Sequence, residues 1–137
     1  MDILTPAQRT HRMGLVRAKN TKPEMAVRRL VHELGYRYRL HGRSLPGRPD
    51  MVFASLRKVV FVHGCFWHRH SGCAKASTPK ANVQFWLAKF RANRKRDRLI
   101  ERRLIAVDWG VITIWECELR EPAKLKRRLI RELGSVR

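Results

Sequence analysis

Residues 51–62 read Met-Val-Phe-Ala-Ser-Leu-Arg-Lys-Val-Val-Phe-Val, and this stretch decides the fold class. Met51–Ala54 and Lys58–Val62 are two short runs rich in β-forming residues, and the tight connection Ser55–Arg57 joins them. Two such runs with a short connection predict a β-hairpin. The end of the second run, Val-Val-Phe-Val, is apolar throughout, which is typical of a central buried strand.

A helix is predicted before the hairpin, with a further strand between the two. Thr21 is a cap-type residue, and Pro23 and Glu24 complete a helix-start signature. Apolar residues then recur at helical spacing up to Gly35, at Val27, Leu30, Val31 and Leu34. Tyr36–Leu40 alternates aromatic or apolar residues with arginine, as a half-buried strand does, and residues 42–47 are predicted to form a loop.

Two more helices and one more strand are predicted after the hairpin. Asn82–Leu104 is the longest helical segment, with a dense basic run on one side and an apolar side made of Val83, Leu87, Phe90 and Leu104. Val111–Trp115 is a third β-type run, and Lys124–Leu133 is an amphipathic helix that ends at Gly134. Helices mixed with a few central strands predict an α/β fold, with a small mixed sheet flanked by helices.

The length and charge of the chain bound its organisation and its partners. A chain of 137 residues suits one domain, which we expect over residues 21–137, preceded by a flexible basic arm over residues 1–20. The net charge is +20, and 44% hydrophobic residues indicate a folded body that carries this charge on its surface. Nucleic acid is therefore the leading partner.

An anionic membrane surface is the alternative anionic partner. No stretch approaches the roughly 20 apolar residues that a spanning helix needs, and the amphipathic segments have the pattern of core-facing helices. The first residues contain only Ile3 and Leu4 before polar residues, so we expect no signal peptide and a cytoplasmic location.

The cysteine and histidine residues predict a metal site. Cys65, His70 and Cys73 have the spacing Cys-x4-His-x2-Cys, and Cys117 follows the third β-type run. Zinc prefers four such ligands in a closed tetrahedron, so we expect one structural zinc ion held by these four residues. Two alternatives stay open: His68 in place of His70 as the ligand, and Cys117 as an ordinary small buried residue.

Two motifs carry a resemblance to a known family. Residues 45–50 read Leu-Pro-Gly-Arg-Pro-Asp, and residues 63–68 read His-Gly-Cys-Phe-Trp-His. The segments 20–24 (Asn-Thr-Lys-Pro-Glu), 84–87 (Gln-Phe-Trp-Leu) and 115–117 (Trp-Glu-Cys) support them in the same order. Together these pieces resemble the very-short-patch-repair (Vsr) mismatch endonucleases over residues 8–120. The resemblance implies a restriction-endonuclease-like core.

The residues in these motifs suit phosphodiester cleavage, which needs a cation, a base and a group near the leaving oxygen. Asp50 follows a proline at a strand start and can face a hard cation such as magnesium. His68 can act as the general base, because its ordinary pKa lies near working pH. His63 could support the phosphate from the other side.

The resemblance assigns roles to these residues and adds others. It implies that Asp50 and the backbone carbonyl of Val62 hold magnesium, that His68 activates water, and that Glu24 and His63 assist. Restriction-endonuclease-like folds usually carry an acid-x-Lys pair on the second strand, whereas Lys58–Val62 has no acid. The Vsr family shares this departure, although it often has a hydroxyl residue at the position of Val62.

Several aromatic and basic residues are expected to contact DNA. Phe66 and Trp67 are adjacent in an irregular segment, where they could form a wedge that enters the base stack. The resemblance gives Trp86 and Met13 the same role, and Lys89 and Asn93 could contact the mismatched bases. Phosphate contacts are expected from Arg48, Arg91, Arg94, Lys95, Arg96 and Arg98.

The resemblance predicts a monomeric enzyme that nicks one strand of duplex DNA beside the thymine of a G:T mismatch, as left by deamination of 5-methylcytosine. Mismatch-repair proteins and a DNA polymerase are then the expected functional partners, in a bacterial-type nucleoid. The alternatives are a non-catalytic zinc-containing nucleic-acid-binding module and a related nuclease with relaxed recognition. The sequence does not define the bases that flank the mismatch.

Overall fold

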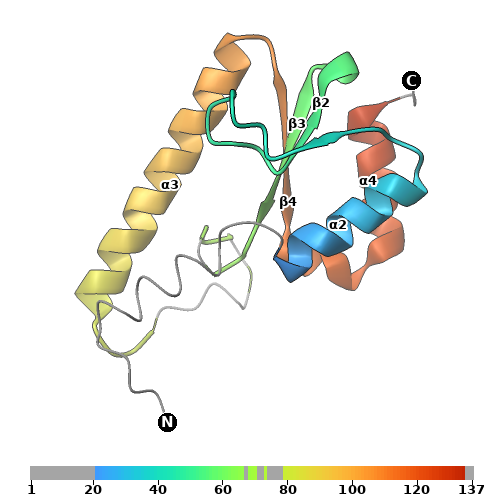
Figure 1. Cartoon of the computed structure of the whole chain (residues 1–137). Coiled ribbons are helices and arrows are strands. Elements are labelled where there is room, and N and C mark those ends of the chain that lie inside the picture. Colours follow the sequence, from blue (N-terminus) through green and yellow to red (C-terminus); the bar gives the residue numbers. More distant parts are fainter. Residues whose placement is uncertain (1–20, 67, 71–72, 74–78, 135–137) are drawn as a thin grey trace.

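The computed structural model describes residues 21–66, 68–70, 73 and 79–134, and Figure 1 shows its elements. Its sheet contains four strands in the order β1-β2-β3-β4: β1 (Arg39–Leu40), β2 (Met51–Phe53), β3 (Lys58–His63) and β4 (Gly110–Trp115). The pairs β1–β2 and β2–β3 are antiparallel, whereas β3 and β4 are parallel. The predicted mixed α/β architecture is therefore confirmed.

The predicted hairpin is the β2–β3 pair. Its register aligns Met51 with Val60 and Phe53 with Lys58. A 3-10 turn, η1 (Ala54–Leu56), joins the strands, and Arg57 closes the turn with a left-handed φ of 54°. Strand β3 has a neighbour on each side, and Val59 and Val60 are fully buried. It is therefore a central strand, as its sequence predicts.

Strand β1 is shorter than the predicted segment Tyr36–Leu40. Only Arg39 and Leu40 pair with β2. In the residues before β1, side-chain burial still follows the predicted alternation: Tyr36 is buried and Tyr38 half-buried, while Arg37 between them is exposed. Both tyrosine rings pack on Phe53 of β2. Side-chain packing thus extends further along this segment than backbone pairing does.

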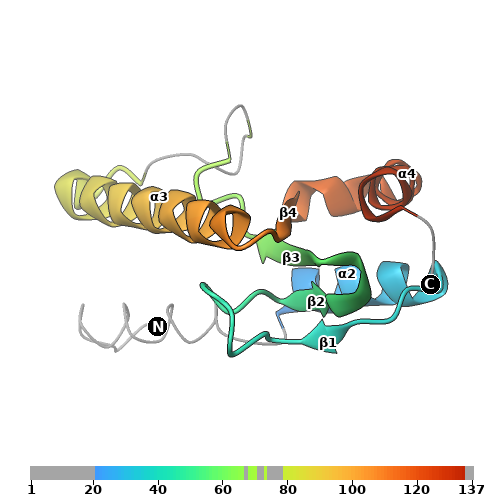
Figure 2. The same ribbon diagram turned by 90° about the horizontal axis from the view of Figure 1, so that it is seen from above.

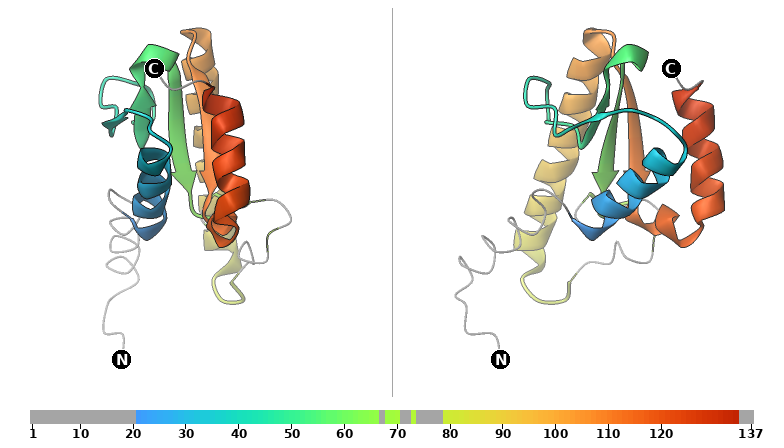
Figure 3. Two further views of the ribbon diagram at one scale, coloured as in Figure 1. Left: turned by 90° about the vertical axis from the view of Figure 1, so that its right-hand side faces the viewer. Right: turned by 45° about the vertical axis from the view of Figure 1, so that its right-hand side comes forward.

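Helices cover both faces of the sheet (Figures 1 and 3). On one face lie α2 (Lys22–Glu33) and α4 (Pro122–Leu133), which close the main core through residues that include Val27, Leu129 and the strand residue Val60. On the other face lies α3 (Val83–Ala106), where Leu104 packs with Val59 and Val52. Neighbouring residues on β3 therefore face different helical layers, as strand geometry requires.

The helix ends confirm the predicted start and stop signals. The Thr21 hydroxyl accepts a hydrogen bond from the backbone N–H of Glu24 at 3.3 Å, which caps α2. Helix α4 begins at Pro122 and ends before Gly134, whose φ is 81°. A short 3-10 segment, η3 (Glu116–Arg120), links β4 to α4. No helix among the described residues is long and apolar enough to cross a membrane.

The predicted apolar side of α3 is only partly right. Phe90 and Leu104 are buried, but Val83 and Leu87 are each 38% exposed. The reason is that the N-terminal part of α3 extends past the edge of the sheet (Figures 1 and 2), so no strand lies beneath these two residues. Asn93, which was expected to contact the mismatched bases, is 3% exposed.

The loop between β1 and β2 packs against α3 at Gly47. Gly47 has a φ of 74°, and a Cβ atom built there would lie 2.4 Å from Cγ2 of Ile100. A side chain at this position would therefore push the loop away from α3. Glycine satisfies both the backbone conformation and the close approach.

We predict that Gly47→Ala destabilises the protein by about 1–2 kcal/mol for the left-handed backbone and a further 1–3 kcal/mol or so for the clash. The control is Gly47→Ala in the background of Ile100→Ala, which removes the Ile100 atoms that the added Cβ would meet. Thermal unfolding of the two single variants and the double variant separates the two effects, because the double variant loses the clash and keeps the cost of the backbone conformation. Strictly additive losses of stability would contradict the close packing on Ile100.

Candidate active site and metal centre

An open cleft of about 600 Å³ lies between the sheet and α3. Its walls are formed by the loop between β1 and β2, the C-terminal end of β3, part of β4, His68, and the α3 segment from Asn93 to Glu101. Four of the predicted catalytic or magnesium-binding residues, Asp50, Val62, His63 and His68, line this cleft. Side chains from distant parts of the sequence therefore meet at one place.

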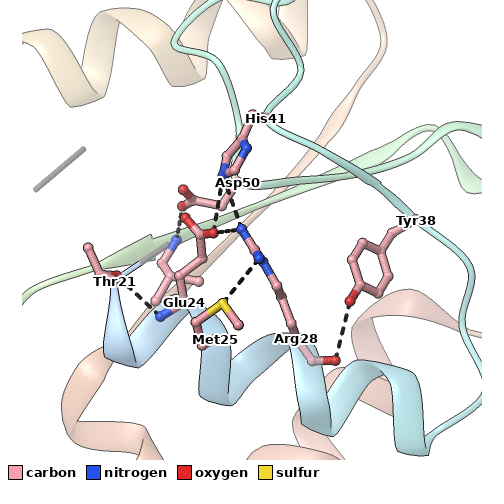
Figure 4. Close-up of polar contacts among 8 residues, drawn as sticks. Thr21, Glu24, Met25, Arg28, Tyr38, His41 and Asp50 are labelled. Carbon is pink, nitrogen blue, oxygen red and sulfur yellow. Dashed lines mark hydrogen bonds and ion pairs between the residues drawn. The ribbon is translucent and has the colours of Figure 1, made fainter. Parts of the chain in front are cut away.

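One wall of the cleft carries carboxylates. The backbone N–H of Val62 donates a hydrogen bond to Oδ2 of Asp50 at 2.6 Å, which fixes the Asp50 carboxylate beside β3. Burial raises the pKa of Asp50 to about 7, and the neighbouring Glu24 carboxylate adds to the increase, whereas the Val62 N–H opposes it. Glu24, 1% exposed, projects from α2 toward Asp50 (Figure 4).

The carboxylate wall suits a hard divalent cation. Ligand atoms of Glu24, His41 and Asp50 all lie within 4.8 Å of one another. Oxygen atoms dominate this set, and magnesium prefers a few carboxylate oxygens together with water and phosphate. Two carboxylates that lie close together with little access to water repel each other, and a proton or a cation between them relieves the repulsion. The raised pKa of Asp50 shows that a proton is favoured there when no cation is bound.

The same cleft also carries a set of imidazoles, which we call the imidazole wall. Nδ1 of His68 lies 2.6 Å from Oδ2 of Asp97, and the His68 ring stacks on His63 with centroids 3.7 Å apart. Since a carboxylate only accepts, Nδ1 of His68 carries the proton and Nε2 is the basic nitrogen of the neutral ring. Burial lowers the pKa of His63 to about 4, and the adjacent His68 contributes, so His63 is neutral at neutral pH.

Asp97 is a site residue that the sequence reasoning missed. It lies in the basic run of α3, and because its neighbours are mostly arginines, this segment was interpreted as a phosphate-binding surface. A signal was present, because Asp97 is four residues after Asn93 and three before Ile100, and residues at these spacings share one helix face. All three line the cleft.

The four predicted metal-ligating residues also come together. Nδ1 of His70 lies 3.7 Å from Sγ of Cys65 and 3.3 Å from Sγ of Cys117, and the ligand atoms of Cys65, His70, Cys73 and Cys117 are mutually within 4.8 Å. A tetrahedral zinc ion with ordinary bond lengths separates sulfur and nitrogen ligands by roughly 3.6 Å, so the spacing fits. His68 instead contacts Asp97, so the nearer histidine is His70.

The local environment of this Cys/His cluster also favours a cation. Burial raises the pKa of Cys65 to about 12, and the adjacent Cys117 and Cys73 side chains raise it further, while a backbone hydrogen bond from Cys117 opposes the increase. The ring of His70 stacks on Trp115 with centroids 4.2 Å apart, which orients the imidazole. Thiols so placed become good ligands once a divalent cation replaces their protons.

The candidate DNA-contacting aromatics lie beside α3. Phe66 is half-buried, with its ring 5.2 Å from Phe90 and 5.8 Å from Trp86 between centroids. Trp86 is half-buried, whereas Phe85 next to it is 49% exposed. Met13 and Trp67 lie outside the described residues. Phe66 and Trp86 therefore share one aromatic cluster, anchored by the buried Phe90.

The basic residues divide between two faces of α3. Arg96 and Asn93 line the cleft between the sheet and α3 together with Arg48, whose φ is 47°. The other predicted phosphate contacts line a separate groove of about 520 Å³ with Arg69, and they are Arg91, Arg94, Lys95 and Arg98. Helical geometry places this second set on the side of α3 away from the cleft. Lys89 is half-buried.

Comparison with known proteins identifies the family. Residues 1–75 match the family described as DNA mismatch endonuclease Vsr. The chain is 51% identical to the type II nicking enzyme V.XorIIP of Xanthomonas oryzae pv. oryzae, with 93% of each chain covered. The chain belongs to the Vsr family. It is thus a Vsr-family DNA mismatch endonuclease or nicking enzyme, and the resemblance drawn from its motifs is confirmed.

Two further Vsr relatives match nearly the whole chain. The type II nicking enzyme V.NmeAIP of Neisseria meningitidis serogroup A is 40% identical, with 99% of this chain and 96% of the relative covered. The DNA mismatch endonuclease Vsr of Escherichia coli K12 is 37% identical, with 96% of this chain and 83% of the relative covered. Membership of this family supports a DNA endonuclease, in preference to a non-catalytic binding module.

We predict that Asp97→Asn reverses the tautomer of His68. An asparagine amide can donate to Nδ1, so the ring proton should move to Nε2. Long-range ¹⁵N–¹H correlation spectra of the histidine rings measure this change, and the spectrum of His70, which lies in the other cluster, serves as the internal control. Unchanged His68 nitrogen shifts would contradict the contact with Asp97.

Proposed function

We propose that this Vsr-family protein uses magnesium to hydrolyse one strand of duplex DNA next to the thymine of a G:T mismatch. The observation that carries the proposal is the pairing of a carboxylate wall with an imidazole wall in one cleft, with Asp50 on the first and the His68–Asp97 pair on the second. Hydrolysis of a phosphodiester needs both kinds of group. The names of the relatives support the same reaction class.

The carboxylate wall would hold the cation. Asp50 is the principal ligand, the backbone carbonyl of Val62 is the second, and Glu24 assists from α2. When bound, magnesium supplies positive charge against the charge that develops on the phosphate oxygens. The hydrogen bond from the Val62 N–H holds one oxygen of Asp50 beside β3. The protein thereby sets the direction of the carboxylate before substrate arrives.

The imidazole wall would supply the base. Nε2 of His68 takes a proton from the attacking water while the water oxygen bonds to phosphorus and the bond to the leaving oxygen breaks. Asp97 keeps His68 in the required tautomer and stabilises the imidazolium that forms. His63 remains neutral and can donate a hydrogen bond to the phosphate without competing for the water proton.

DNA recognition would use the aromatic cluster and the basic faces. We propose that Phe66, Trp67 and Trp86 enter the base stack from one groove and Met13 from the other, at a step where a mismatch already weakens pairing. Lys89 and Asn93 contact the mismatched bases, while Arg48 and the arginines of α3 neutralise phosphates. The exposed N-terminal part of α3 supports this role, because the sheet does not cover it.

We also propose a domain organisation, an oligomeric state, a cellular location and functional partners. Residues 21–137 act as one endonuclease domain, with residues 1–20 as an arm that reaches the DNA. The protein acts as a monomer in the bacterial nucleoid, and a DNA polymerase and mismatch-repair proteins work with it on the damaged strand.

The decisive experiment is cleavage of end-labelled duplexes that differ only by a G:T mismatch or a matched pair, with and without magnesium. We expect one nick, in the thymine-containing strand, only with the mismatch and the metal. Asp50→Asn should lower the rate by more than about 100-fold, since loss of an outer-shell partner of a metal ligand alone costs about 10- to 100-fold.

Asp108→Asn is the matched control, because Asp108 is exposed in the turn between α3 and β4 and lies outside the cleft. Its rate should equal that of the wild type. Equal cleavage of matched duplexes would favour a nuclease with relaxed recognition, and normal turnover by the Asp50 variant would remove Asp50 from the site.

We also propose that Cys65, His70, Cys73 and Cys117 hold one structural zinc ion. The cluster joins the loop after β3 to η3, and Sγ of Cys117 lies beside Nδ1 of His70. With four protein ligands, no position remains for a reacting water, so the zinc would act on stability and not on the chemical step.

Cys117→Ser should remove this zinc and destabilise the protein by about 4 kcal/mol or more, which is the scale of losing a metal site. Elemental analysis of chelator-washed protein should find one zinc per wild-type chain and far less in the variant. Thermal unfolding with added zinc provides the control, because only the wild type should regain stability. A full complement of zinc in the variant would contradict the role of Cys117.

A further inference from the structure

His41 lies in the catalytic cleft although no motif identifies it. It follows β1 directly, has a left-handed φ of 48°, and lines the cleft with a side chain that is 17% exposed. Its backbone N–H donates to the carbonyl of Asp50 at 3.1 Å. Histidine tolerates this backbone conformation better than bulky or β-branched residues do. The backbone of His41 is therefore tied to Asp50, the residue immediately before β2.

The side chain of His41 forms a triangle with Glu24 and Arg28 (Figure 4). Nε2 of His41 lies 3.1 Å from Oε2 of Glu24 and 3.1 Å from a terminal nitrogen of Arg28, and the same Arg28 nitrogen contacts Oε2 of Glu24. A protonated Nε2 donates directly to Glu24, whereas an unprotonated Nε2 accepts from Arg28, which itself donates to Glu24. In either tautomer, His41 restrains the Glu24 carboxylate.

His41 reaches Glu24 from a different element than Arg28 does, although both contact the same carboxylate oxygen. Arg28 and Glu24 are four residues apart on α2, so their ion pair alone would hold the carboxylate along the helix. His41 belongs to the sheet side, on the same loop that leads to Asp50. Its contact therefore holds Glu24 toward Asp50 and the cleft, while Arg28 balances part of the buried negative charge.

We propose that His41 is a positioning residue of the active site, which fixes the Glu24 carboxylate against Asp50 during the nicking reaction. This inference rests on the proposed function, and in particular on a role for Glu24 in the reaction. His41 then affects the rate of the chemical step through Glu24 and has little effect on how tightly DNA binds.

The test compares four variants: His41→Leu, His41→Gln, Glu24→Gln and the double variant Glu24→Gln/His41→Leu. The measurements are the single-turnover nicking rate at saturating enzyme, the Kd for uncleaved duplex without metal, and the melting temperature. His32→Leu is the matched control, because His32 is an exposed histidine in the last turn of α2 and lies outside the cleft.

We expect His41→Leu to lower the nicking rate about 10- to 100-fold, as loss of an orienting partner does, with the Kd unchanged. His41→Gln should recover much of the rate, because its amide can donate to Glu24 or accept from Arg28. In the background of Glu24→Gln, His41→Leu should have no further effect, since residues that act as a unit are not additive. His32→Leu should behave as the wild type.

Three results would overturn the inference. A normal rate for a folded His41→Leu variant would remove His41 from the site. A weaker Kd with an unchanged rate would make it a DNA contact instead. An equal loss in the Glu24→Gln background would show that it acts independently of Glu24. If Glu24→Gln itself nicks at the normal rate, the proposed role of Glu24 fails together with the inference, whereas the first three results leave that role intact.

Discussion

The position of β3 between an antiparallel and a parallel neighbour is the constraint on which the rest of the molecule depends. On one side, the register with β2 brings the N–H of Val62 to the carboxylate of Asp50. On the other side, the parallel register with β4 pairs His63 with Trp115, two residues before Cys117. The segment that follows β3 therefore starts between a carboxylate and a thiol that are far apart in the sequence, and both candidate sites form at the same end of the sheet.

Electrostatics imposes a second constraint. The chain carries a net charge of +20, yet Asp50 and Asp97 both line the cleft, and Glu24 lies beside Asp50. Each of them has a specific partner: Arg28 for Glu24, the Val62 N–H for Asp50, and His68 for Asp97. Basic side chains at the rim can attract a phosphate backbone while these partnered acids keep the local negative charge that a divalent cation requires.

Sequence reasoning predicted those parts of the fold that depend on local patterns. The hairpin follows from two β-type runs, the capped start of α2 from Thr21 and Pro23, and α4 from its apolar period. The exposure of Val83 and Leu87 was not predictable in this way, because helical periodicity does not show where the sheet beneath a helix ends. The length of β1 was not predictable either, because it depends on backbone pairing with β2. The alternation from Tyr36 to Leu40 indicates only which side chains are buried.

Site residues were predictable where the residue type and its spacing indicate a chemistry. They were not predictable where only the tertiary structure brings a residue to the site. Asp50, His68 and the Cys/His set carry rare residue types in recognisable spacing, and the structure brings each set together. His41 lacks such spacing, and the spacing of Asp97 from Asn93 and Ile100 indicates a shared helix face but no chemistry. Asp97 is one acid among many arginines, and His41 is a single histidine in a loop, so only the tertiary fold reveals that both touch other site residues.

The described residues of the segment that carries His68 form no strand or helix, and this has a consequence for conformational entropy. The backbone-to-backbone hydrogen bonds described there are short-range, from His68 to Gly64, from His70 to Cys65 and from Cys73 to His70. Its order comes from side chains on either side of His68: Cys65 and His70 meet Cys117, and His63 lies against the imidazole itself. Short chain lengths between fixed points leave few accessible loop conformations. The freedom of the imidazole is therefore lost when the protein folds, and little remains to be lost when a substrate arrives.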